Sequence, residues 1–132
     1  MAHREQPMTT IRITAGDVSA LAELRDSPTA RKIIEALPIE GVAQRWGKEV
    51  YFAIPVSADL EPDARDRVEV GELGYWPEGE AFCIFFGPTP ASSGAQPVAA
   101  SPVNILGRVT GDAAVFDAVK RGTTVRLEKA GR

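Results

Sequence analysis

Aromatic residues are the side chains of this sequence best suited to binding chemistry, and five of the nine stand between Gly74 and Pro90. Tyr75 and Trp76 precede a Pro-Glu-Gly turn, and Phe86 ends the uncharged run that follows it. Aromatic side chains beside a proline-rich loop favour a shallow apolar ligand site. Neighbouring residues of a strand point to opposite faces, so we expect one of Tyr75 and Trp76 to pack inward and the other to face a groove or solvent.

Two polar residues could orient a ligand at such a site. Asn104 and Arg108 lie on one face of a later predicted strand, although a solvated position explains Arg108 as well. Burial in the core is the alternative for each aromatic residue. The candidate ligand-binding residues are Tyr51, Tyr75, Trp76, Phe86, Asn104 and Arg108. The sequence leaves open whether their ligand is a small molecule or an extended peptide.

Other kinds of site are weakly supported. The only histidine is His3 in the N-terminal tail, so we expect neither a Ser-His-Asp triad nor a histidine-ligated metal. The lone cysteine, Cys83, stands in the most apolar run, where a small buried side chain is expected. Four carboxylates could bind a metal or pair as acid and base, although solvated turns explain them equally well. They are Glu69, Glu72, Glu78 and Glu80. We predict no metal, no cofactor and no identifiable catalytic residue.

Length and charge limit the class of protein. A chain of 132 residues is the size of one domain, and 44% hydrophobic with 25% charged residues is ordinary for a globular protein. A net charge of -3, with basic residues spread singly, argues against nucleic acid as a partner. No signal peptide or membrane segment is recognised. We therefore expect a cytoplasmic protein that binds no membrane, and the oligomeric state stays open.

The aromatic stretch must be positioned by a fold rich in strands. Alternating apolar residues predict strands over 9–15, 18–24, 48–55, 68–76, 81–86, 103–110 and 123–128. The run over 81–86 is expected to be buried on both faces. About eight strands could close into an antiparallel β-barrel that hides its edges, with residues 9–132 as one domain and residues 1–8 as a disordered tail.

Helices and loops complete this prediction. Ser27-Pro28 and Asp112 can begin two short helices near 28–37 and 112–120, and the second should bury Val115, Phe116 and Val119. The segments 57–67 and 87–102 have no apolar period and are predicted to be loops. Gly107, inside a strand, indicates a bulge or a close backbone approach.

The end of the chain resembles the closing segment of cyclophilins, in which a Phe/Leu-Gly-Lys/Arg-Val strand leads into a short helix. Here the motif is Leu106-Gly107-Arg108-Val109, and Phe85-Phe86 resembles the paired phenylalanines that floor the cyclophilin groove. Trp46-Gly47 and Gly74-Tyr75-Trp76-Pro77 are similar to motifs of an uncharacterised prokaryotic family of cyclophilin-like proteins, and this resemblance runs from Ile11 onward. It implies a closed eight-stranded antiparallel β-barrel with two capping helices.

The resemblance does not reach the catalytic residues of cyclophilins. They use an arginine in a Phe-His-Arg-Val-Ile-Pro context, and the nearest match here, Tyr51 to Pro55, contains no arginine. They also carry a groove histidine before the Leu-Gly motif, and none stands near Val103. We therefore expect a binding module with an apolar groove and little or no isomerase activity. A weak or divergent peptidyl-prolyl isomerase is the alternative.

Overall fold

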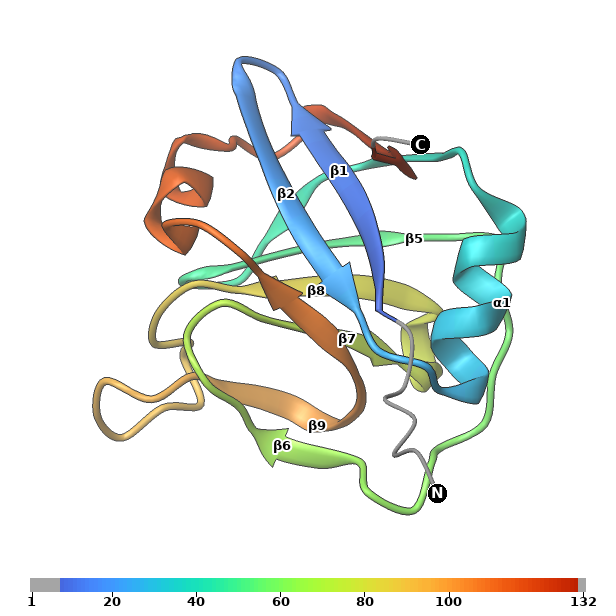
Figure 1. Ribbon diagram of the computed structural model, residues 1–132. Helices are drawn as coiled ribbons and strands as arrows, with labels where there is room; N and C mark the ends of the chain where they lie inside the picture. Colours follow the sequence, from blue (N-terminus) through green and yellow to red (C-terminus); the bar gives the residue numbers. More distant parts are fainter. Residues whose placement is uncertain (1–7, 131–132) are drawn as a thin grey trace, which may run out of the picture.

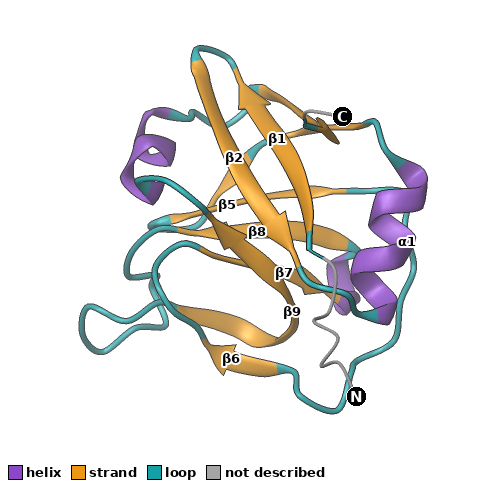
Figure 2. Cartoon of the chain, viewed as in Figure 1, coloured by secondary structure: helices purple, strands orange, loops and turns teal. Residues whose placement is uncertain are grey.

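The computed structural model describes residues 8–130, which form a mainly β, antiparallel fold (Figure 1, Figure 2). Ten strands and three helical segments are present in this range. The strands are β1 (Thr9–Ala15), β2 (Val18–Leu24), β3 (Ile39–Val42), β4 (Gln44–Arg45), β5 (Glu49–Ala53), β6 (Arg65–Arg67), β7 (Glu72–Trp76), β8 (Ala81–Phe85), β9 (Val98–Val109) and β10 (Thr124–Lys129). The helical segments are α1 (Pro28–Ala36), the 3₁₀ turn η1 (Pro77–Gly79) and the 3₁₀ helix η2 (Ala113–Ala118). The tail predicted over residues 1–8 lies, apart from Met8, outside the described residues.

The sheet is not closed by hydrogen bonds. Its strand order is β3-β10-β1-β2-β9-β7-β8-β5-β4, and β6 pairs with β9. The two end strands, β3 and β4, are consecutive in the chain and joined through Ala43. The two ends of the sheet instead pack against each other, because β3 lies against β5, the neighbour of β4. Gly41 of β3 is so close to Phe52 of β5 that a Cβ atom on Gly41 would come within 2.7 Å of the Phe52 ring. The expected closed eight-stranded barrel is therefore not confirmed, whereas the antiparallel sheet with two helices is.

Strand β8 separates two hydrophobic clusters. Phe82, Ile84 and Phe86 point into the main core, on the side that we call the inner face of the β5–β8–β7 sheet. Cys83 and Phe85 point to the outer face and belong to a second, smaller cluster. The prediction that this strand is buried on both faces is confirmed.

Both predicted helices are present, and the second differs in kind. In α1 the Ser27 hydroxyl accepts from the Ala30 amide at 3.2 Å, as an N-cap does. The helix η2 has three residues per turn, so Phe116 and Val119 share its buried side, and Val115 is 41% exposed. The prediction that Val115 lies inside was wrong for this reason. No helix within residues 8–130 has the length and apolar character needed to cross a membrane.

The two predicted loops each contribute to a strand. Residues 98–102 extend β9 and pair with β6, with Arg65 opposite Val103 and Arg67 opposite Val98. The residues of β6 and of the start of β9 lack an apolar period because the two-stranded ribbon that they form lies over the outer face and is partly exposed. Later in β9, Gly107 lies against β2, where a Cβ atom would be 1.8 Å from the Glu23 carbonyl oxygen. The close backbone approach predicted at Gly107 is confirmed.

Candidate functional site

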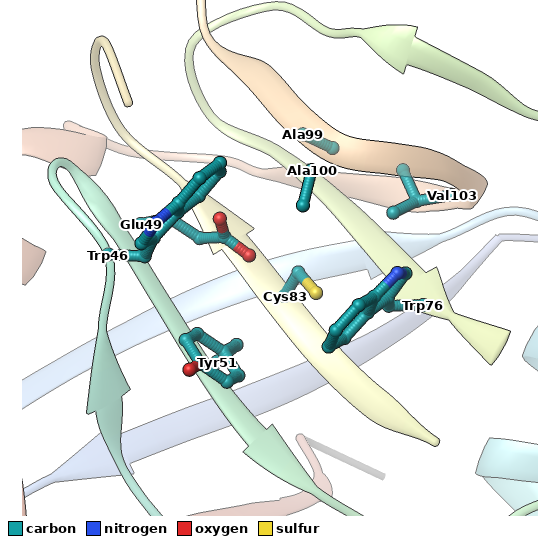
Figure 3. A pocket seen from close by; sticks show the side chains of 8 residues that line it. All are labelled: Trp46, Glu49, Tyr51, Trp76, Cys83, Ala99, Ala100 and Val103. Carbon is teal, nitrogen blue, oxygen red and sulfur yellow. The ribbon is translucent and has the colours of Figure 1, made fainter. Parts of the chain in front are cut away.

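A cavity of about 190 Å³ lies on the outer face, between β5, β8 and the end of β7 on one side and the first half of β9 on the other (Figure 3). The β9 segment carries small side chains here and leaves space between itself and the sheet. The residues that line the cavity are Trp46, Glu49, Tyr51, Trp76, Cys83, Ala99, Ala100 and Val103. They come from segments up to 57 positions apart, so the fold assembles this site.

Three aromatic side chains form the walls of the cavity. Trp46, in the turn that joins β4 to β5, lies across the space from Trp76, and Tyr51 lies below both (Figure 3). The rings of Tyr51 and Trp76 meet edge to face, with centroids 6.4 Å apart. The Trp76 indole N–H donates to the Ser101 hydroxyl at 2.7 Å, and its ring covers Gly79, where a Cβ would come within 2.6 Å. Trp76 is therefore held in place by both contacts.

The carboxylate of Glu49 points into the same space, between Trp46 and Cys83 (Figure 3). Glu49 is only 6% exposed, and within residues 8–130 it has no ion pair and no hydrogen bond from an N–H or O–H group. Its polar neighbour is the Cys83 thiol, a weak donor. Burial disfavours the charged form and raises the pKa of Glu49 to about 7, and the Cys83 thiol acts in the opposite direction.

Cys83 forms the floor of the cavity and is 1% exposed. Burial, together with the charge of Glu49, raises the pKa of this thiol well above its ordinary value. A thiol of raised pKa holds little thiolate at neutral pH and is a poor nucleophile. The expectation of a small buried side chain at Cys83 is met by this position.

The structure brings together two of the six residues proposed from sequence. Tyr51 and Trp76 both line the cavity. Tyr75 instead lies in the main core, fully buried, with its hydroxyl donating to the Val56 carbonyl at 2.6 Å. Phe86 also joins the main core, and the Arg45 guanidinium lies 5.1 Å from its ring centre. The expectation that Tyr75 and Trp76 face opposite sides is confirmed, with Tyr75 inside.

The two expected polar handles lie away from the cavity. Asn104 is fully buried, and its amide donates to the Thr29 hydroxyl at 3.0 Å and to the Asp59 carbonyl at 2.9 Å. Its carbonyl accepts from the Glu61 amide at 2.7 Å, so it fixes the 57–64 segment to α1. Arg108 is exposed on β9, opposite Glu72 of β7. Neither side chain lines the cavity.

The four carboxylates near the central hairpin do not converge. Glu72 is bound by both terminal nitrogens of Arg65, at 3.0 and 2.9 Å, and Glu80 accepts from the Ser57 hydroxyl at 2.6 Å. Glu69 and Glu78 are exposed. Within the described part of the chain, no three His, Cys, Asp or Glu side chains are grouped as a metal site would require.

Sequence reasoning missed Trp46 and Glu49 as site residues. The signal for Glu49 was its place two positions before Tyr51, since alternate residues of a strand share a face. A charged residue that shares a strand face with an aromatic residue is unusual when it is buried, because charged side chains are rarely buried without a partner. Ala99 and Ala100 could not be found in this way, because their segment was predicted to be a loop.

Comparison with known proteins agrees with the fold. A family model described as cyclophilin-like matches residues 9–128. The chain is also similar to a hypothetical protein of Archaeoglobus fulgidus, with a TM-score of 0.79 to its solution structure, 35% sequence identity, and coverage of 98% of this chain and 100% of that chain. No curated protein matches. Because the family model covers nearly the whole sequence, this chain belongs to the cyclophilin-like family.

Proposed function

We propose that this protein is a binding module that takes a small ligand, or one side chain of an extended peptide, into the cavity on the outer face. The observation that carries this proposal is an apolar cavity with one buried carboxylate that no basic group neutralises among residues 8–130. Ligand sites are commonly apolar spaces with a few polar groups that fix orientation. Of the six ligand-binding residues expected from sequence, this proposal keeps only Tyr51 and Trp76.

The size of the cavity limits the ligand. Its volume of about 190 Å³ is smaller than the roughly 300–1,000 Å³ of pockets that enclose drug-sized molecules. A compact molecule, or a single terminal group of a longer one, would fill it. The wall residue Trp76 is the anchor that we expect to matter most, since desolvated aromatic side chains dominate such contacts.

A fragment screen by NMR, read on the indole N–H signals of Trp46 and Trp76, tests this proposal. We expect small fragments to shift both signals in the wild-type protein. Ala100→Phe should abolish the shifts because Ala100 is an exposed rim residue that points into the cavity, so a larger side chain there blocks it. Ala114→Phe, at an exposed alanine of η2, is the matched control. Shifts that persist in Ala100→Phe, or a screen without binders, would refute the proposal.

A further inference from the structure

We propose that the ligand of this cavity is a small organic cation, with an alkylated ammonium group held between Trp46, Tyr51 and Trp76 over the carboxylate of Glu49. This inference rests on the proposed binding function and gives the chemical class of the ligand. We call the three aromatic residues with Glu49 the aromatic cage. Its four side chains all reach the same space in Figure 3.

The aromatic walls favour a cation over a neutral or negative group. The face of an aromatic ring carries partial negative charge and attracts a cation within about 6 Å of its centre. The cage offers rings from three directions, and the planes of Tyr51 and Trp76 are 86° apart, so they present different surfaces to one guest. The Trp76 N–H is already occupied by Ser101. Trp76 therefore contributes its ring surface and offers no donor to an anion.

The charges of the lining residues also favour a cation. The eight lining residues include one acid, Glu49, and no lysine, arginine or histidine. The Glu49 carboxylate opens onto the cavity and has no ion pair within residues 8–130, and a cation in the cavity would supply the missing partner. Glu72, the other buried glutamate of the outer face, has a basic partner within the chain, because Arg65 binds it through two hydrogen bonds. At Glu49, the position that such a basic partner would take is open to the cavity.

The lining also distinguishes between kinds of ammonium group. A primary ammonium has three N–H donors, and each needs an acceptor when it is buried. The wall formed by β9 consists of Ala99, Ala100 and Val103, whose side chains accept no hydrogen bond. Methyl groups on the nitrogen need no acceptors and pack against apolar and aromatic surfaces, which is the basis of aromatic-cage recognition. The alkylated form is therefore the better fit.

Binding of a cation should depend on pH through Glu49. The titratable groups that face Glu49 are Tyr51 on its own strand and Cys83 on β8. The parts of β7, β9 and the Trp46 turn that line the cavity contribute no titratable or charged side chain. Burial raises the pKa of Glu49 to about 7, so the carboxyl is largely protonated at lower pH. Affinity for a cation should thus increase as pH rises through 7.

Choline and its uncharged counterpart of the same shape, 3,3-dimethylbutan-1-ol, test the inference directly. Binding of each to the full chain is measured at about pH 8 from the Trp46 and Trp76 indole signals, and tetramethylammonium serves as a second cation. We expect both cations to bind, and choline to bind about tenfold more tightly than the alcohol, which is about 1.4 kcal/mol. Glu49→Gln should remove most of that preference, whereas Glu78→Gln, at an exposed glutamate outside the cavity, should keep it.

The outcomes separate this inference from the proposed function. If the alcohol binds as tightly as choline, the cavity is a ligand site without preference for cations, and only the inference falls. The inference also falls if neither cation shifts the indole signals while neutral fragments do. If no probe of any charge shifts them, both proposals fall. The comparison of choline with the alcohol on wild-type protein decides the question even if Glu49→Gln does not fold.

Discussion

Two glutamates are buried on the outer face of the same sheet, and their surroundings differ. Glu72 on β7 is 8% exposed and receives two hydrogen bonds from Arg65 and one from the Glu69 amide at 2.8 Å. Glu49 on β5 is 6% exposed and faces a cavity with no basic side chain. Burial alone therefore does not mark a functional carboxylate. The two sites differ in charge pairing: Glu72 has a basic partner, Arg65, and Glu49 has none among residues 8–130.

The two surroundings shift the carboxyl groups in opposite directions. Burial raises the pKa of Glu72, but hydrogen bonds from Arg65 and the Glu69 amide lower it more, so its pKa lies below the usual value. At Glu49, burial outweighs the opposing effect of the Cys83 thiol and raises the pKa to about 7. Glu72 should thus stabilise the fold at neutral pH, whereas ionised Glu49 should destabilise it. Three experiments test this difference between the two regions.

The largest effect is expected from Glu49→Gln. A folded pKa of about 7 against an ordinary 4.5 means that the fold prefers neutral Glu49, and this preference is fully present below the unfolded pKa and lost as pH rises through 7. The variant should therefore raise the free energy of unfolding by about 3 kcal/mol at about pH 8 and change it little at about pH 4. Denaturant unfolding at both pH values measures this. A variant less stable than wild type at the higher pH would contradict the account.

Glu72→Gln should have a smaller effect of the opposite sign. The change removes the charge that Arg65 binds and should lower the free energy of unfolding by about 2 kcal/mol at neutral pH. Because the folded pKa of Glu72 is lowered, the loss should shrink as pH falls below the ordinary carboxyl range, where the wild type also loses its ion pair. Unfolding curves of the two variants side by side provide the check. Equal and same-signed effects would remove the distinction between the two regions.

The smallest of the three expected results is the rate in a prolyl isomerase assay. Cyclophilins polarise the prolyl amide with an arginine, and here Arg65 is engaged by Glu72 while the cavity has no arginine. A protease-coupled assay on Ala-Pro peptides should show at most weak acceleration. A robust rate that survives Ala100→Phe would place a catalytic site elsewhere on the molecule.

Much of the fold could be predicted because its signals are local. Alternation placed Tyr75 and Trp76 on opposite faces of their strand without deciding which of them is inside, and the cap at Ser27 located α1. The pairing of β6 with β9 could not be predicted, because its partners are more than 30 positions apart and neither has an apolar period. The first half of β9, which pairs with β6, forms one wall of the cavity. Ala99 and Ala100, and the wall that they form above Glu49, were therefore recognised only once β9 was in place.

Titration of the glutamate side-chain carboxyl carbons by ¹³C NMR shows whether Glu49 is a buried carboxyl without a basic partner. Uniformly labelled protein shows both groups in one sample, so Glu72 serves as the internal reference. We expect a midpoint of about 7 for Glu49 and one below 4.5 for Glu72. A Glu49 midpoint at or below 4.5 would mean that its charge is already neutralised, and would contradict the account.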